Sequence, residues 1–291
     1  MGKNSDFCIF IISHGRYNNV VTHRTLKRKK TTYPIYIVVD DTDEQIDDYK
    51  KTFGKGNVIV FNKEEIAKTT DHGDNFWNLR TTTHARNACF DIAKDLGYTY
   101  FLVLDDDYTG FQYRIDDKFN YPKPVKSVYS LDPIFDMFLE YYKKTNAKSI
   151  CMAQGGDYIG GNNGFGIGRT VYSRKAMNSW FCSVDRRFKF VSRLNEDVNT
   201  YLTLGQRGDL FLTVPFISLS QQATQKSEGG MTDAYLDSGT YVKSFYTVMY
   251  CPSYCSVSMM GTTNRRIHHK IKWNNASPMI LSPDYKKEKK L

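Results

Sequence analysis

The feature that most restricts the fold is an alternation, over the first hundred residues, of short apolar runs with polar segments. The runs at 7–12, 33–41, 57–61 and 98–104 have the length and composition of buried strands. Before the last of them, residues 83–97 repeat small and aliphatic side chains at helical spacing and end in a glycine suited to capping a helix. Strands separated by helices form a mainly parallel sheet that binds ligands at its carboxyl edge. The pattern therefore predicts an α/β fold with a Rossmann-like, mostly parallel central sheet flanked by helices.

The rest of the chain has a more mixed pattern, with no internal repeat and no linker that would divide it. Residues 220–245 are polar and rich in Gly, Ser and Thr, which predicts a mobile loop. We therefore expect one domain over residues 1–291. The other expected segments are amphipathic helices at 131–145 and 195–208, a glycine-dense stretch at 149–173, a strand at 209–215 and a basic, frayed tail at 285–291.

Charge and cysteine usage narrow the class of protein. The 40 lysines and arginines exceed the 31 aspartates and glutamates, and the net charge of +9 favours nucleic acid, acidic surfaces or phosphorylated ligands as partners. A basic surface that binds no specific partner is the alternative explanation of this charge. The one close cysteine pair, Cys251 and Cys255, is wider than a redox pair and has no second pair to complete a zinc site, so we expect a reduced, cytoplasmic protein. The apolar run 7–12 is too short for a signal peptide or a bilayer span, so we expect no membrane association.

Three consecutive aspartates at a strand end are the clearest indication of chemistry. Asp105, Asp106 and Asp107 follow the run 98–104, and unpaired negative charge at a buried strand end is costly. A hard cation, Mn²⁺ or Mg²⁺, would neutralise them through carboxylate oxygens. Enzymes that use nucleotide sugars have this D-x-D spacing, because the cation stabilises the diphosphate leaving group. We expect Asp105 and Asp107 to bind the metal and Asp105 and Asp106 to face the nucleotide sugar. A solvated turn is the alternative.

Further motifs occur in an order that resembles GT-A-fold glycosyltransferases of the family-two type, and the resemblance extends over most of the chain. Arg86, in His-Ala-Arg-Asn, resembles an arginine that contacts the nucleotide. His14 and Arg16, in Ser-His-Gly-Arg, lie where such enzymes wrap the base. Asp40 and Asp41 end the second strand and resemble the acids that meet uracil or ribose. The resemblance implies a GT-A fold and a UDP-sugar as the donor.

The same resemblance implies a catalytic pair. Glu196 and Asp197 open the helix expected at 195–208. In inverting members the aspartate of this pair is the general base for the acceptor hydroxyl, so Asp197 would take that role and Glu196 would assist. A helix N-terminus favours an ionised carboxylate, although it also explains the pair as ordinary capping residues. Retaining chemistry stays open. Three candidates for contact with the donor sugar lie in the glycine-dense stretch: Asp157, Gly161 and Asn163.

A histidine doublet near the C-terminus completes the set of motifs. GT-A enzymes often supply a late histidine as a metal ligand, which His268 or His269 would provide; the sequence does not distinguish them. Imidazole suits Mn²⁺ better than Mg²⁺. Arg266 and Lys270 would add positive charge against the diphosphate. The alternative is a basic, partly exposed segment.

A narrower resemblance concerns the acceptor. The motif Ser-His-Gly-Arg, the triple aspartate and the compact chain are similar to the TET/JBP-associated glycosyltransferases, which are found largely in phages. That similarity implies transfer to 5-hydroxymethylcytosine or 5-hydroxymethyluracil in double-stranded DNA, in the cytoplasm of a host cell. It divides the chain into a nucleotide-binding half at 1–107 and a half for sugar and acceptor at 108–291. A protein, glycan or small-molecule acceptor is the alternative, and a nucleic-acid-binding module without catalysis is a further one.

Overall fold

The computed structural model describes residues 4–118, 120–122, 124–158, 169–174, 176–177, 179–221, 239, 241–260, 265–278 and 280–285. The strands are β1 Phe7–Ile12, β2 Ile35–Asp40, β3 Val58–Phe61, β4 Tyr100–Asp105, β5 Tyr108–Tyr113, β6 Lys126–Ser127, β7 Ser149–Ala153, β8 Ser179–Ser183, β9 Phe211–Gln221, β10 Cys255–Met260 and β11 Arg266–Ile271. The helices are α1 Val21–Arg28, α2 Ile46–Phe53, α3 Lys63–Ala67, α4 Thr83–Asp95, α5 Asp132–Lys144, α6 Glu196–Gly205, α8 Val242–Tyr250 and α9 Trp273–Ala276.

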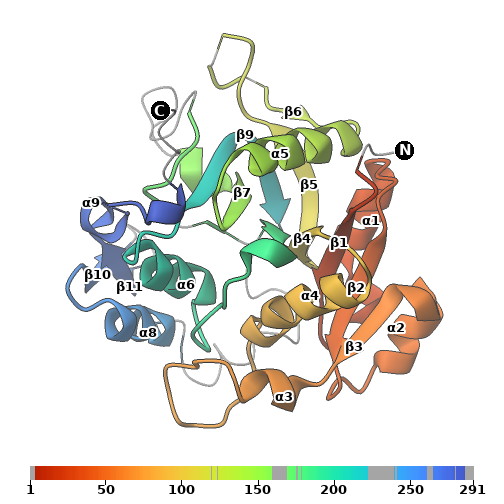
Figure 1. Ribbon diagram of the computed structural model, residues 1–291, viewed down its shortest axis with the longest axis horizontal. Helices are drawn as coiled ribbons and strands as arrows, with labels where there is room; N and C mark the ends of the chain where they lie inside the picture. The colour runs from red at the N-terminus through yellow and green to blue at the C-terminus, as the bar shows by residue number, and fades with distance from the viewer. Residues whose placement is uncertain are drawn as a thin grey trace.

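Nine of these strands form one sheet, in the order β3-β2-β1-β4-β8-β7-β9-β5-β6 (Figure 1). The first four are parallel and are the four strands expected from the sequence, with ends that differ by one or two residues. The register pairs Ile12 of β1 with Val38 of β2 and with Asp105 of β4. The carboxyl ends of these neighbouring strands therefore meet at one edge, where the loops carrying the predicted site begin.

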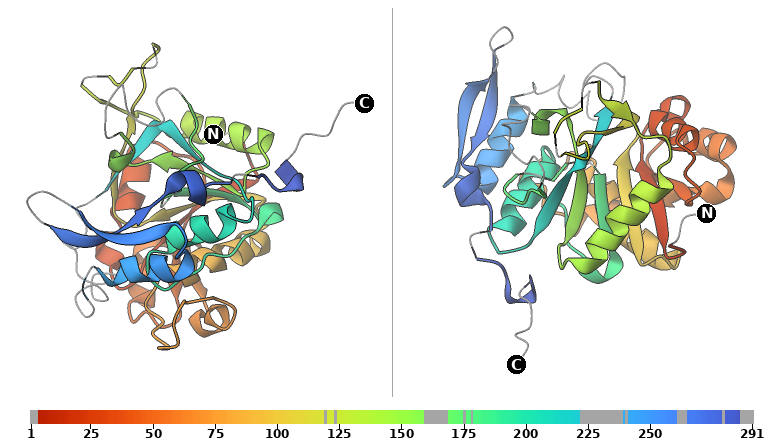
Figure 2. Two further views of the ribbon diagram at one scale, coloured as in Figure 1. Left: turned by 90° about the vertical axis from the view of Figure 1, so that its left-hand side faces the viewer. Right: turned by 90° about the horizontal axis from the view of Figure 1, so that it is seen from above.

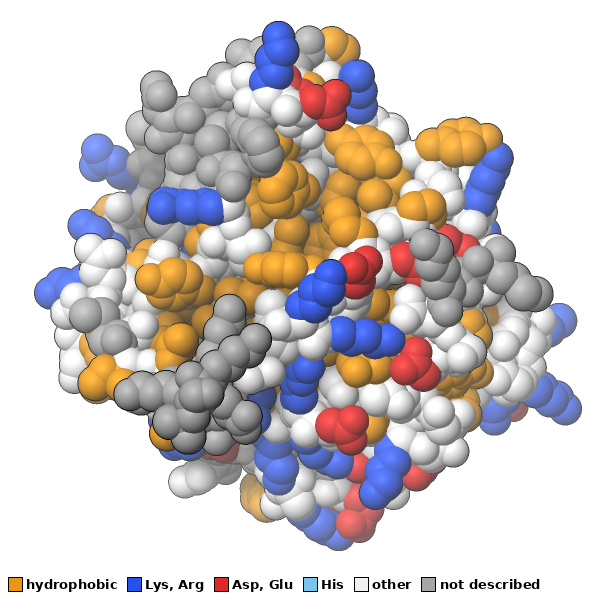
Figure 3. All heavy atoms as spheres, turned by 45° about the horizontal axis from the view of Figure 1, so that its top comes forward, with side chains coloured by type: hydrophobic (Ala, Val, Ile, Leu, Met, Phe, Trp, Pro, Cys, Tyr) orange, Lys and Arg blue, Asp and Glu red, His pale blue; other side chains and the backbone are white. Residues whose placement is uncertain are grey.

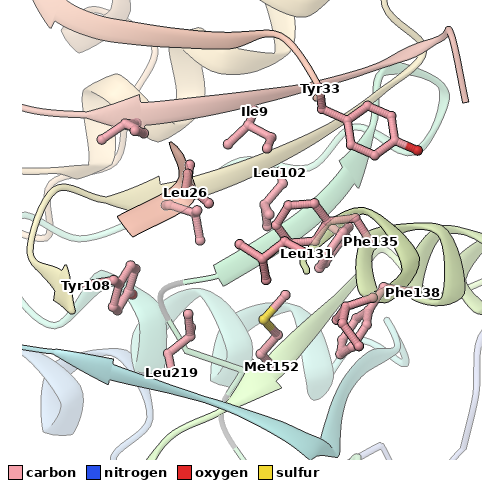
Figure 4. Packing of buried hydrophobic residues seen from close by; sticks show 14 of the residues in the cluster. Ile9, Leu26, Tyr33, Leu102, Tyr108, Leu131, Phe135, Phe138, Met152 and Leu219 are labelled. Atoms are coloured by element: carbon pink, nitrogen blue, oxygen red, sulfur yellow. The ribbon is translucent and has the colours of Figure 1, made fainter. Parts of the chain in front are cut away.

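The sheet has a hydrophobic core on each face, which explains the continuous apolar runs. Every residue of β1 is buried, and alternate residues belong to two different clusters. One cluster includes side chains of α1, α2 and α5, and Figure 4 shows Leu102 of β4 and Phe135 of α5 within it. The other includes side chains of α4 and α6. Helices thus flank both faces, as expected, and all six cysteines are buried and unpaired.

Strand β9 is longer than the strand expected at 209–215, because it continues through Pro215 to Gln221. Proline cannot donate a ladder hydrogen bond, so it is tolerated where pairing is interrupted. The register with β7 shifts at this point, from Met152 opposite Val214 to Ala153 opposite Ser218. Beyond the shift, β9 pairs with β5 on its other side. An alternating pattern alone could not reveal a strand that changes partners.

The loop expected at 220–245 is shorter than predicted at both ends. Strand β9 includes residues 220–221, and α8 begins at Val242, so residues 242–245 are helical. Most of the remaining loop, the sites Gly161 and Asn163, and the tail beyond Tyr285 lie outside the described residues. The helix expected at 195–208 ends at Gly205, and a turn follows it.

A second, two-stranded sheet is formed by β10 and β11 alone. This hairpin lies beside α8, at the end of the molecule opposite α2 and β3 (Figures 1 and 2). Among the residues that the structure describes, no helix has both the length and the apolar composition required to span a bilayer.

Candidate active site

The turn after β4 is fixed by the first residues of α1. The Thr22 hydroxyl donates to the carbonyl of Asp105 at 2.6 Å, and the Thr22 amide donates to the carbonyl of Asp106 at 2.9 Å. The same hydroxyl accepts from the amide of Tyr108 at 2.8 Å. Three backbone groups of the turn are thus satisfied by one threonine, and the side chains of the three aspartates diverge from a fixed backbone.

Asp106 is directed towards the loop that follows β1. Its carboxylate accepts from Ser13 Oγ at 2.6 Å and from Arg16 Nη1 at 3.3 Å. Burial raises the pKa of Asp106, and the charge of Arg16 opposes that rise. The Arg16 amide in turn donates to the Tyr49 hydroxyl at 3.0 Å. Asp106 and Arg16 were both expected to contact the nucleotide sugar, and they form an ion pair with each other.

Asp105 is paired with the arginine of the His-Ala-Arg-Asn motif. Arg86 lies on α4, is 1% exposed, and donates from Nη2 to Asp105 Oδ1 at 2.8 Å. Its Nη1 lies 3.1 Å from Glu196 Oε1, an ion pair without hydrogen-bond alignment. Burial opposes the charge of Arg86, yet Asp105 and Glu196 raise its pKa above the ordinary value. One guanidinium therefore joins the D-x-D strand to the Glu-Asp helix.

Asp107 is the aspartate without a described hydrogen-bond partner at one buried oxygen, Oδ1. Burial and the charges of Asp105 and Asp106 raise its pKa to about 7. An unsatisfied carboxylate oxygen beside a second carboxylate suits a hard divalent cation, so these residues fit Mg²⁺ or Mn²⁺. No group of three or more His, Cys, Asp or Glu side chains placed to hold a metal occurs within the described residues. Phosphate oxygens, water or a further side chain would have to complete the set of ligands.

The Glu-Asp pair lies in the first turn of α6, as expected. Glu196 accepts from the Thr82 hydroxyl at 2.8 Å in addition to its contact with Arg86, and burial raises its pKa. Asp197 is 8% exposed, and its Oδ1 accepts from the amide of Val198 at 2.8 Å. Burial raises the pKa of Asp105, the charge of Arg86 opposes that rise, and the charges of Asp106 and Asp197 add to it.

The histidine doublet lies on β11, and one of its members contacts the residue before the pair. His269 Nδ1 is 3.5 Å from the side-chain amide of Asn195, which immediately precedes Glu196. His268 Nδ1 instead lies 2.8 Å from the carbonyl of His269. Neither histidine joins a metal-binding cluster among the described residues. Lys270, on the same strand, is exposed.

Besides the pairs Asp106–Arg16 and Asp105–Arg86, a further cluster of charged side chains lies around the end of β2. His14 Nδ1 lies 2.8 Å from Asp40 Oδ2, and Lys63 Nζ lies 3.3 Å from Asp40 Oδ1. Burial opposes ionisation of Asp40, but the hydrogen bonds from His14 and Thr42, together with the charges of His14 and Lys63, outweigh it and hold its pKa below the ordinary range. Asp41 is exposed and accepts from the amide of Lys63 at 3.0 Å. His14 and Asp40, which the sequence assigned separately to the nucleotide, thus contact each other, and Asp41 follows Asp40 in the chain.

Sequence reasoning missed three members of this region. Asp43 accepts from the Gly15 amide at 2.8 Å, Lys63 is buried against Asp40, and the Tyr49 hydroxyl binds Ser13 Oγ at 2.8 Å. Asp43 continues the Asp-Asp-x-Asp series after β2, which was an available signal. Nothing in the local sequence marks Lys63 or Tyr49, because they reach the site from separate helices.

Several solved structures are similar to this chain in overall fold, at low sequence identity. S. aureus TarS 1-349 has 12% identity and a TM-score of 0.41 over 84% of this chain, which spans 65% of that fragment. Glucosyl-3-phosphoglycerate synthase from Mycobacterium tuberculosis, in complex with Mg²⁺ and UDP, has 8% identity and a TM-score of 0.46 over 91% of this chain and 87% of its own. GalNAc-T7, with UDP, GalNAc and Mn²⁺, has 15% identity and a TM-score of 0.45 over 74% of this chain, which spans 43% of that protein.

No curated protein matches the chain. A family model does match, that of the TET-associated glycosyltransferases, and the match extends over residues 7–230. This range contains β1 to β9, all three aspartates, Arg86 and the Glu-Asp pair. The chain therefore belongs to the TET-associated glycosyltransferase family.

Proposed function

We propose that this glycosyltransferase moves a sugar from a UDP-sugar to the hydroxymethyl group of 5-hydroxymethylcytosine or 5-hydroxymethyluracil in phage DNA, inside the host cytoplasm. The observation that carries the proposal is the position of Arg86. It contacts Asp105 at 2.8 Å and Glu196 at 3.1 Å, so the aspartate assigned here to the metal and diphosphate shares one guanidinium with the neighbour of the proposed base. A donor and an acceptor hydroxyl could be held together there.

The donor end of the site is assigned to the acidic turn and the loop after β1. Asp105 and Asp107 would hold a divalent cation, with His269 as the further ligand candidate and His268 as the alternative. When bound, the cation supplies positive charge that stabilises the departing UDP. Arg16, held by Asp106, and His14, held by Asp40, lie at the carboxyl ends of β4 and β2, where a nucleotide is bound in folds of this kind.

The acceptor end is assigned to Asp197. Its carboxylate would take the proton of the acceptor hydroxyl while the oxygen forms a bond to the anomeric carbon and the bond from that carbon to UDP breaks. The first turn of α6 favours the ionised carboxylate that a base requires. Glu196 is held by Arg86 and Thr82, so it would position the base rather than accept the proton. Attack from the side opposite the leaving group would invert the anomeric centre.

DNA is supported as the acceptor by the family to which the chain belongs and by its charge. The net charge of +9 suits a phosphate backbone. Figure 3 shows one face of the molecule, on which lysine and arginine side chains are dispersed among hydrophobic ones and among some acidic ones. Gly161, Asn163 and Arg266 stay candidates for contact with the donor, and Lys270 is available to a phosphate.

The test is mass spectrometry of nucleosides from duplex DNA containing 5-hydroxymethylcytosine or 5-hydroxymethyluracil, after incubation with Mn²⁺ and a panel of UDP-sugars. We expect a hexose- or pentose-sized gain on the modified base alone. Asp197→Asn should abolish the gain, while Asp48→Asn, an exposed acid on α2, should not change it. UDP release without a gain on DNA would point to a protein, glycan or small-molecule acceptor. A normal gain with Asp197→Asn would refute the choice of base.

A further inference from the structure

The loop between α3 and α4 exposes two adjacent aromatic side chains. Phe76 is 76% exposed and Trp77 is 75% exposed. Large aromatic rings at this degree of exposure lose the burial that ordinarily stabilises them, and adjacent exposed rings on a soluble protein commonly mark a binding surface. Trp77 also has a φ of 50°, in the left-handed region that disfavours a bulky side chain. The neighbouring contacts explain what keeps the pair in this position.

Asp74 fastens the first part of the loop to two distant segments. Its carboxylate accepts from Arg193 Nε at 2.8 Å and from the Tyr246 hydroxyl of α8. The side chains of Asp74 and Arg193 are each 8% exposed, so this ion pair is shielded from water. The other oxygen of Asp74 accepts from the amide of Phe76 at 3.1 Å. The backbone that carries the aromatic pair is therefore tied to a buried ionic contact.

The second part of the loop leads directly to the candidate active site. The Asn78 side chain accepts from the amide of Arg80 at 3.0 Å and forms a tight turn. Two residues later the Thr82 hydroxyl donates to Glu196 at 2.8 Å, beside Asp197. The aromatic pair thus lies five to six residues along the chain from a contact with the catalytic pair, on a loop held at both ends.

Helix α8, whose Tyr246 donates to Asp74 of this loop, and the hairpin that contacts α8 are both suited to an anionic partner. The described segments 241–260 and 265–272, which form α8 and the β10–β11 hairpin, contain no aspartate or glutamate. Their basic residues are Lys243, Arg265, Arg266, Lys270 and Lys272. Aromatic rings beside cations are the usual composition of a nucleic-acid-binding surface, because bases stack on the rings and phosphates meet the cations.

The burial of the candidate base affects how the acceptor can reach it. Asp197 is 8% exposed, so a nucleotide extruded from the duplex can bring its hydroxymethyl group to the carboxylate more readily than one that stays stacked. Extrusion of the target nucleotide exposes the faces of the bases beside it. Those faces are flat, apolar and available only while the nucleotide is extruded.

We propose that Phe76 and Trp77 stack on the DNA bases exposed when the target nucleotide is extruded, and so stabilise the open duplex beside Asp197. The inference rests on the proposed function, since it takes DNA as the acceptor. Phe76 and Trp77 act as positioning residues, because they touch the neighbouring bases rather than the reacting atoms. The loss of both rings should weaken turnover of duplex DNA while leaving the donor site unchanged.

The experiment compares the wild type with the double variant Phe76→Ala/Trp77→Ala on duplex DNA carrying 5-hydroxymethylcytosine. We expect kcat/KM to fall at least about fivefold, the lower end of the effect of base–aromatic stacking. On DNA that lacks the base opposite the target, extrusion is easier, and the loss should shrink to about twofold or less. Hydrolysis of the UDP-sugar without DNA should be unchanged. Tyr129→Ala, which removes an aromatic ring that is 70% exposed, is the matched control and should have no effect.

A binding measurement separates this inference from the proposed function. Trp180 is fully buried and Trp273 is partly buried, so quenching of tryptophan fluorescence by DNA should come mainly from Trp77. Trp77→Phe should therefore lose most of that quenching, and Trp273→Phe, as the matched control, should keep it. Transfer by the wild type with an unimpaired double variant would overturn the inference and keep the function. Quenching by DNA without any transfer to it would support Phe76 and Trp77 as a surface on which bases stack. The same result would refute DNA as the acceptor. A change in oligomeric state on removal of the rings, without an effect on DNA, would assign the pair to a protein interface and overturn the inference.

Discussion

Replacement of Asp107 by asparagine should make the metal-free protein more stable while it removes metal binding. Burial and the charges of Asp105 and Asp106 raise the pKa of Asp107 from 3.8 to about 7. A carboxylate with a raised pKa opposes folding whenever it is ionised, so its penalty grows as pH rises from 3.8 to 7 and is then constant. Each pKa unit corresponds to about 1.4 kcal/mol, so a shift of about three units gives an upper limit of about 4 kcal/mol at pH 8.

The assay is urea unfolding of the wild type and Asp107→Asn in chelator at pH 5 and pH 8, with Asp48→Asn as the exposed-acid control. We expect the variant to have the larger free energy of unfolding at pH 8, by up to about 4 kcal/mol, and an advantage reduced to about 1–2 kcal/mol at pH 5. Mn²⁺ with UDP at a hundredfold excess over Kd should stabilise only the wild type, by about 3 kcal/mol. A variant that is less stable than the wild type at pH 8, or a difference that does not depend on pH, would contradict the reasoning.

Three other substitutions test the remaining parts of the site. Asp197→Asn should leave the affinity for UDP-sugar within about twofold and reduce transfer by 10² or more, as loss of a general base does; calorimetry with donor and a transfer assay separate the two. Arg86→Met leaves the buried carboxylate of Glu196 without its cation, so the free energy of unfolding should fall by about 3–5 kcal/mol, and full stability in urea would refute the bridge. The hydrogen bond to Asp40 raises the pKa of His14, so the stability that His14 contributes is complete below its ordinary pKa and declines as pH rises through the raised value. The stability difference between wild type and His14→Gln should therefore be larger at pH 6 than at pH 8, and an increase towards pH 8 would contradict the ion pair.

The parallel half of the fold was predictable because its signals are local. The first four strands are apolar on both faces, and their ends follow from the polar residues that succeed them. Arg86, Asp105 and Glu196 were each recognised as separate motifs, yet only the tertiary fold shows that one guanidinium contacts both acids. Spacing along the chain carries no information on that distance, since the residues come from α4, β4 and α6.

The parts that escaped prediction depend on pairing between distant segments. Strand β9 changes partners at a bulge, which a two-residue alternation does not encode. The local sequence does not distinguish Lys63 from any other lysine in a helix. Only the position of α3 next to the end of β2 brings its ammonium group to Asp40. The exposure of Phe76 and Trp77 could not be predicted either, because the sequence alone does not distinguish an exposed aromatic residue from a buried one.

Because the β10–β11 hairpin is separate from the main sheet, Asp105 and His269 differ in how easily they can be displaced. Asp105 ends a strand that is hydrogen-bonded on both sides, so its displacement would require rupture of the ladder with β1 or with β8. His269 lies on a hairpin whose described strands pair only with each other. That hairpin can shift without the loss of a single main-sheet hydrogen bond. Amide hydrogen exchange should therefore be slow at β1 and β4 and faster at β11, so that the strand carrying Asp105 is stiffer than the hairpin carrying His269.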